Sequence, residues 1–160
     1  MIRQQIIFCT GLIACFILMT TQAYAADCKA SPQMGMGTHF KPITQHKIDI
    51  GQGFKVKGVI LSAQGCTPIE NARIEHWQMN TKGEYIDELR AYLMSDANGE
   101  FTFETEWPGS EVPHIHFIVH AEGYKKLIYV WIASEKTNSI DLELVLEPIN
   151  QMTLTQLIKK

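Results

Sequence analysis

The chain has no basic excess, no long hydrophobic run and no clear amphipathic helix, and each absence disfavours a class of protein. Lysine and arginine number 14 against 17 acidic residues, and with no basic cluster we expect neither a nucleic-acid interface nor a site for anionic lipid. The main apolar run, within residues 6–19, is short for a membrane span. No ten-residue segment has the apolar period of an amphipathic helix, which disfavours a parallel α/β sheet.

Residues 1–25 have the pattern of a secretory signal peptide. Arg3 gives a positive start, an apolar stretch follows, and Ala23-Tyr24-Ala25 matches a small-x-small cleavage site. We therefore expect an exported protein, periplasmic or secreted, that does not stay in the membrane after cleavage. About 135 residues then remain, with a formal charge of −4, which is enough for one domain.

Cysteine is scarce, and two of the four, Cys9 and Cys15, fall in the signal segment. In an oxidising compartment the remaining pair, Cys28 and Cys66, predicts one disulfide that ties an N-terminal arm to the first hairpin. Two unpaired cysteines are the alternative. A disulfide here would close a loop of about 40 residues and stabilise the fold by about 3–4 kcal/mol.

Most of the chain predicts short strands separated by turns. Residues 26–52 are rich in glycine, proline and methionine without a period, so we expect an extended arm, and residues 151–160 form a short tail. Residues 53–150 alternate strand and turn signals every 8–12 residues, which predicts one all-β domain, an antiparallel β-sandwich of about seven to nine strands. The expected strands include 54–61, 73–79, 91–95, 101–105, 114–120, 126–132 and 140–146.

The segment His114-Ile115-His116 gives the strongest indication of chemistry. Alternate residues of a strand face the same side, so the two imidazoles should project together. Two neutral imidazoles on one rigid face form half of a metal site. Tyr85, about thirty residues upstream, could add a phenolate, and the set predicts a non-haem iron site. His120 lies on the same face but is expected to face solvent.

Several motifs in one order resemble the intradiol ring-cleavage dioxygenases, over roughly residues 54–125. The stretches that carry the resemblance are Cys66-Thr67-Pro68-Ile69-Glu70-Asn71-Ala72, Ile74-Glu75-x-Trp77-Gln78-x-Asn80-x-x-Gly83-x-Tyr85, Asp96-x-x-Gly99-x-Phe101-x-Phe103-x-Thr105, Pro108-Gly109, His114-Ile115-His116-Phe117 and Gly123-Tyr124.

The resemblance implies a β-sandwich that binds one non-haem Fe(III) through two tyrosinates and two histidines. Tyr85, His114 and His116 match three of these ligands. It also implies a small aromatic diol of the catechol type and O₂ as reactants, with cleavage between the hydroxyl-bearing carbons. Many members of the family are dimers or larger assemblies, so a homodimer is an open expectation.

The chain departs from the family between Pro108-Gly109 and the histidine pair. Family members carry a second tyrosine there and then an arginine, and this chain has neither. Glu111, Tyr92, Tyr129 or water could fill the fourth place. We favour Glu111 as a catalytic group, because a carboxylate suits ferric iron and could accept a catechol proton. Arg90 is predicted to bind a substrate carboxylate, with a structural salt bridge as the alternative.

Two other functions stay open. The first is a catalytically impaired β-sandwich that binds a metal or an aromatic ligand; the missing tyrosine and arginine, and Val130 where the family has glutamine, favour it. The second is a cupin-type copper or zinc site, although no second cupin-like motif follows the histidine pair.

Several other ring residues receive a structural interpretation. We expect Trp77 in the sandwich core, because alternating aromatic residues are what a sandwich buries. His76 is expected to be a hydrogen-bonded core or edge residue. His39 and His46 lie in the arm and are expected to be solvated.

Overall fold

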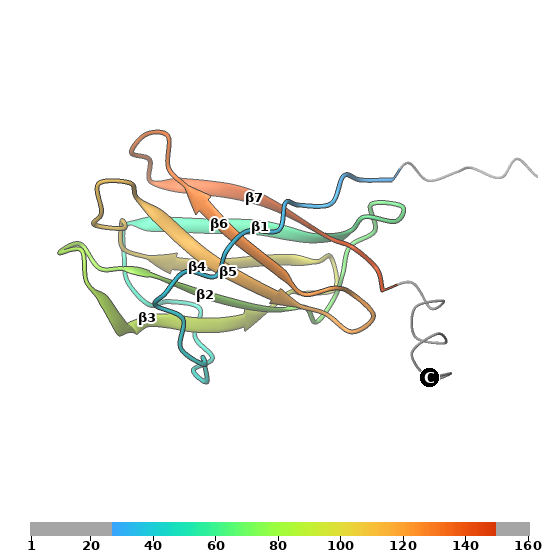
Figure 1. The fold of residues 1–160 in the computed structure, drawn as a ribbon, viewed down its shortest axis with the longest axis horizontal. Helices are drawn as coiled ribbons and strands as arrows, with labels where there is room; N and C mark the ends of the chain where they lie inside the picture. The colour runs from blue at the N-terminus through green and yellow to red at the C-terminus, as the bar shows by residue number, and fades with distance from the viewer. Residues whose placement is uncertain (1–26, 150–160) are drawn as a thin grey trace, which may run out of the picture.

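The computed structural model describes residues 27–149, which form two packed β-sheets (Figure 1). One sheet has the order β4-β1-β7 and the other β3-β2-β5-β6. The described residues contain no helix, and so none that could cross a membrane. The strands are β1 (Phe54–Ser62), β2 (Arg73–Met79), β3 (Tyr85–Met94), β4 (Glu100–Thr105), β5 (His114–His120), β6 (Leu127–Ile132) and β7 (Ser139–Leu146).

The predicted all-β sandwich is confirmed, with seven strands. One pair differs from the prediction, because β1 and β7 run parallel. A parallel pair needs a long crossover, and the five strands between β1 and β7 provide it. The predicted signal peptide, 1–25, and tail, 151–160, lie outside the described residues.

Strand β3 begins earlier than the sequence indicates. It starts at Tyr85, whereas the predicted strand covers only 91–95. The first part of β3, before residue 91, includes the exposed acidic residues Asp87 and Glu88. Because these residues interrupt the alternation of apolar and polar side chains, the sequence pattern does not indicate a strand there. β3 is an edge strand of its sheet, where charged side chains are common. This extension places Tyr85 on a strand instead of in a turn.

Apolar side chains from both sheets fill the space between them and form the hydrophobic core. The buried residues of this core include Phe54, Val56, Ile60, Ile74, Phe101, Phe103, Ile115, Phe117, Val119 and Leu144. His76 is also fully buried and stacks on Phe103 at 3.8 Å between ring centroids. Its two ring nitrogens have no hydrogen-bond partner within the described residues, so the expectation of a hydrogen-bonded His76 is wrong.

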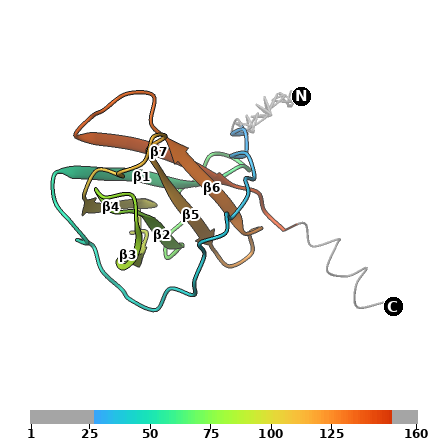
Figure 2. The same cartoon turned by 60° about the vertical axis from the view of Figure 1, so that its left-hand side comes forward.

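The N-terminal arm passes along the outside of the β3-β2-β5-β6 sheet (Figure 2). The predicted disulfide between Cys28 and Cys66 is present and joins the start of the arm to the loop after β1. Trp77 is buried beneath the arm with Ile43 and Ile118. The prediction of a buried tryptophan holds, but its place in the sandwich core is wrong.

Candidate metal centre

A tight turn between β2 and β3 places Tyr85 at the start of its strand. The side-chain oxygen of Asn80 accepts hydrogen bonds from the backbone N–H groups of Lys82 and Glu84, both at 2.9 Å. The Asn80 carbonyl accepts another from Gly83 at 3.0 Å. Asparagine at such a position replaces backbone partners in a turn, so the Asn-x-x-Gly-x-Tyr motif fixes where β3 begins.

Gly109 packs the loop before β5 against this turn. Its N–H donates to the Asn80 carbonyl at 3.0 Å, and a Cβ at residue 109 would lie only 2.4 Å from that oxygen. The approach is therefore open only to glycine. Glu106 adds a second tie by accepting from the Thr81 N–H at 2.8 Å. The Pro108-Gly109 motif thus holds the loop leading to the histidine strand beside the turn that leads to Tyr85.

His114 and His116 project from the outer face of β5. In the register His116 lies opposite Trp77 on β2, and its ring stacks on the indole at 4.8 Å and 5°. The Nδ1–H of His114 donates to the Val112 carbonyl at 2.7 Å. A carbonyl can only accept, so Nδ1 carries the proton and Nε2 keeps a free lone pair. A hydrogen bond at Nδ1 thus orients His114, whereas His116 is held through the face of its ring, and its Nδ1 has no hydrogen-bond partner among the described residues.

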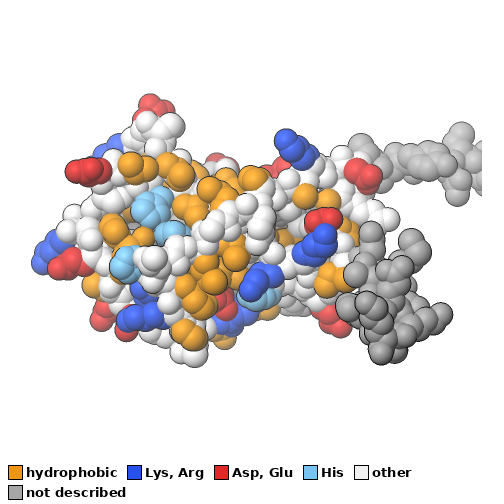
Figure 3. Space-filling view, viewed as in Figure 1, with side chains coloured by type: hydrophobic (Ala, Val, Ile, Leu, Met, Phe, Trp, Pro, Cys, Tyr) orange, Lys and Arg blue, Asp and Glu red, His pale blue; other side chains and the backbone are white. Residues whose placement is uncertain are grey.

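Three donor atoms converge at this point. The Tyr85 hydroxyl oxygen lies 3.0 Å from Nε2 of His114 and 3.2 Å from Nε2 of His116. Two donors each about 2.0–2.1 Å from one ion are roughly 3 Å apart, so the residues fit a shared metal. Among residues 27–149 no group of three or more His, Cys, Asp or Glu side chains could hold a metal, and the third donor here is the phenol. Figure 3 shows histidine side chains gathered at one end of this face.

Two of the three donors, Tyr85 and His116, are uncharged at neutral pH. Burial raises the pKa of the Tyr85 phenol, and the Arg90 guanidinium lowers it in part. Burial, followed by the charges of His114, His39 and Arg90, lowers the pKa of His116 to about 4. His116 is therefore neutral, whereas the phenol keeps its proton until a bound cation displaces it.

The structure does not bring all the predicted site residues together. Glu111 is exposed on the loop before β5, outside the donor cluster. Tyr129 lies opposite Phe117 on the inner face of the sheet, and the Tyr92 ring lies under the Arg73 guanidinium at 3.4 Å. None of these three side chains fills the fourth place.

Arg90 is buried, and its guanidinium is already bound. Its Nη1 donates to the His39 carbonyl at 2.8 Å, and its Nε lies 3.3 Å from the Asp87 carboxylate. This arrangement favours the structural alternative for Arg90 over binding of a substrate carboxylate.

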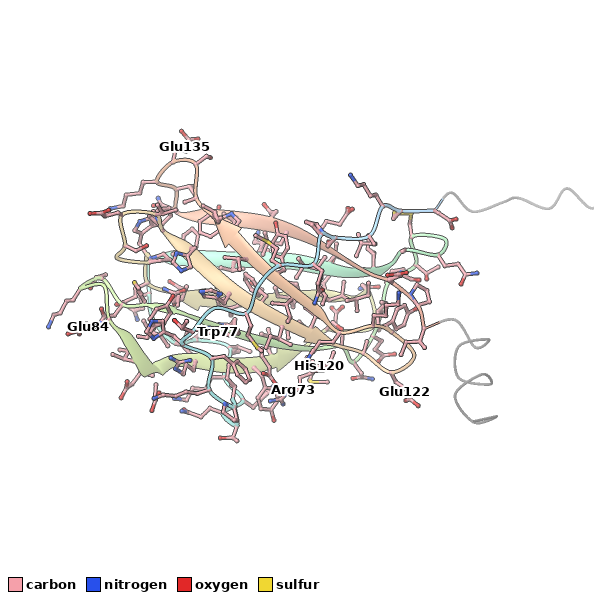
Figure 4. The ribbon with its side chains drawn as sticks, viewed as in Figure 1. Arg73, Trp77, Glu84, His120, Glu122 and Glu135 are labelled. Atoms are coloured by element: carbon pink, nitrogen blue, oxygen red, sulfur yellow. A yellow bond between two sulfur atoms is a disulfide. The ribbon has the colours of Figure 1, made fainter. Side chains whose placement is uncertain are left out.

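His39 is a neighbour of the site that no local sequence pattern predicts. It is exposed, as expected for a residue of the arm, but its ring also stacks on Tyr85 at 4.3 Å and 16°. The arm has no period, and 46 residues separate the two rings, so no local pattern pairs them. His120 lies opposite Arg73 at the other end of β5, away from Glu84 in the β2–β3 hairpin (Figure 4). It is exposed, as predicted.

Two curated relatives share part of the sequence. Catechol 1,2-dioxygenase of Acinetobacter baylyi is 28% identical over 108 residues, 48% of this chain and 34% of that protein. Hydroxyquinol 1,2-dioxygenase of Corynebacterium glutamicum is 37% identical over 71 residues, 40% of this chain and 22% of that protein. The chain thus spans about a third or less of these relatives. No family model matches it.

Solved structures share the fold. The dioxygenase domain of a carbohydrate-binding fusion protein from Streptomyces sp. SirexAA-E has a TM-score of 0.67 at 20% identity, covering 76% of this chain and all of that domain. The 3-chlorocatechol 1,2-dioxygenase of Rhodococcus opacus 1CP has a TM-score of 0.65 at 17% identity, covering 74% and 73%. The resemblance seen in the sequence is confirmed: the chain is a relative of the intradiol ring-cleaving dioxygenases and shares their β-sandwich.

Proposed function

We propose that this protein is exported, binds one non-haem ferric ion through Tyr85, His114 and His116, and cleaves a catechol-type ring with O₂. The observation that supports this most is the convergence of the phenol oxygen and two Nε2 atoms within 3.0 and 3.2 Å. Ferric iron is a hard cation that prefers an anionic oxygen to a third imidazole. When bound, the ion would withdraw electron density from a chelated catechol and so prepare the ring for O₂.

The residues of the chain bind the metal and orient its ligands. Tyr85 supplies the anionic donor, and its proton must leave as the metal binds. The Val112 carbonyl orients His114, and the indole face of Trp77 orients His116. Partners of this kind fix the ring orientation of metal-bound histidines. The disulfide between Cys28 and Cys66 supports export, because such bonds persist in oxidising compartments.

Glu111 is our proposal for the group that accepts a catechol proton. Its carboxylate belongs to the loop that also supplies the Val112 carbonyl to His114, so it is close in sequence to the ligands although outside their cluster. Glu111→Gln should lower kcat and leave the iron content unchanged. An unchanged kcat would assign the proton to another acceptor, such as water.

A second candidate function is a protein that binds a metal or an aromatic ligand without catalysis. It is favoured by the three-donor set, because the part of the chain that the structure describes offers no second tyrosine beside the imidazoles. This candidate keeps the metal site and loses only turnover.

Ferric reconstitution of the mature protein tests both candidates. Phenolate bound to ferric iron gives a visible charge-transfer band, which Tyr85→Phe should abolish. Tyr92→Phe is a matched control, because Tyr92 lies on the same strand but packs against Arg73; the band should survive. O₂ uptake on addition of catechol identifies the enzyme. A band without uptake leaves the binder, and absence of both iron binding and a band refutes the proposed site.

A further inference from the structure

The N-terminal arm is fastened across all four strands of the sheet that carries the metal donors. At β6, the Met34 N–H donates to the Ile128 carbonyl at 2.9 Å, and the Met34 sulfur accepts from the Val130 N–H at 3.3 Å. At β3, the Tyr92 N–H donates to the Gln45 carbonyl at 2.9 Å. The segment between these ties therefore has to cross β5 and β2, where the imidazoles and the indole lie.

The middle of the arm contacts two of the three donor side chains. Gly37 adopts φ +75°, and a Cβ built on it would lie 3.2 Å from Cε1 of His116. Two residues later the His39 ring lies parallel to the Tyr85 ring at 4.3 Å. The arm thus packs against one donor ring from β5 and one from β3.

Arg90 holds His39 in this place through its backbone. The guanidinium donates to the His39 carbonyl at 2.8 Å and pairs with Asp87. Asp87 also accepts from the Lys41 ammonium at 2.8 Å, so the arm is tied on both sides of residue 40. Arg90 is only 5% exposed, and a buried charged hydrogen bond of this kind is strong and directional.

We propose that His39 is a positioning residue of the metal centre: its ring holds the Tyr85 phenol in the orientation that lets the oxygen bind an ion together with His114 and His116. This inference rests on the proposed function. It makes the arm part of the centre. A ring contact beyond simple burial corresponds to a change in affinity of about three- to tenfold, so its loss should be measurable without abolishing binding.

The test compares three variants of the full mature protein. His39→Ala removes the stacked ring, and His39→Phe keeps a ring but removes the nitrogens. His46→Ala is the matched control, because His46 is another arm histidine whose ring meets a tyrosine, Tyr92, edge-on at 5.2 Å and 63°. The readouts are ferric affinity in competition with nitrilotriacetate, and the position and width of the phenolate charge-transfer band.

We expect His39→Ala to bind ferric iron three- to tenfold more weakly and to show a shifted or broadened band. His39→Phe should restore both, and His46→Ala should match the wild type. A wild-type band and affinity in His39→Ala would overturn the inference while leaving the proposed function intact. So would a His39→Phe variant as impaired as His39→Ala, since the nitrogen and not the ring face would then matter. A wild-type protein that binds no ferric iron would instead refute the proposed function, and the inference with it.

Discussion

His76 should make the folded protein sensitive to acid. The side chain is fully buried between the sheets, stacked on Phe103, and burial lowers its pKa from 6.5 to about 3. In the unfolded chain the same ring titrates near its ordinary value of about 6.5. Below that pH the unfolded chain binds a proton that the folded chain does not, so the free energy of unfolding falls as the pH falls.

The size of the effect follows from the two pKa values. Above about pH 6.5, His76 is neutral in both states and does not change the free energy of unfolding. Below that pH, the free energy of unfolding falls by about 1.4 kcal/mol for each pH unit, until about pH 3. Between pH 7 and pH 4.5 the loss is therefore about 2–3 kcal/mol. That is a large share of the roughly 5–15 kcal/mol that stabilises a typical domain.

Urea unfolding of the metal-free protein at several pH values measures this loss. The variant His76→Leu, of similar volume and without a titratable group, isolates it from other groups such as His116. The packing cost of the substitution changes the free energy of unfolding by the same amount at every pH. The comparison therefore uses only the slope of the free energy of unfolding against pH. The variant should lose about 2–3 kcal/mol less than the wild type between pH 7 and pH 4.5. Equal slopes would refute the assignment of a buried, uncharged His76.

Three further predictions concern stability and metal binding. Replacing both Cys28 and Cys66 with serine should lower the free energy of unfolding by about 3–4 kcal/mol in urea titrations, because the disulfide closes a separation of 38 residues; no loss would mean that the arm is held without it. Ser95→Ala should cost about 1–3 kcal/mol, since its buried hydroxyl pairs with two backbone groups at 2.7 and 2.9 Å. Thr102 is exposed, so Thr102→Val, which loses one bond at 3.2 Å, should cost less than about 0.5 kcal/mol; equal costs in the same urea assay would contradict this. Because burial raises the pKa of Tyr85, calorimetry in buffers of different ionisation enthalpy should find one proton fewer released on ferric binding by Tyr85→Phe than by the wild type, and equal release would exclude the phenol as a ligand.

Local sequence patterns predicted the parts of this protein that depend on near neighbours. The strand period put His114 and His116 on one face, and the short alternating segments predicted an all-β sandwich. The Asn-x-x-Gly motif marked the turn that leads into Tyr85. Each of these features is set by backbone geometry within a few residues, so it can be recognised without knowing the rest of the fold.

Contacts between distant segments decided the rest. The sequence could not show that Trp77 is buried by the arm instead of the second sheet, because both environments select the same apolar residue. It could not pair His39 with Tyr85 or Arg90 with the His39 carbonyl, since the arm has no period and such pairs join residues 46 and 51 positions apart. The imidazole pair was therefore predictable from the sequence alone, whereas its closeness to the phenol and its cover by the arm depend on how the sheet and the arm pack in three dimensions.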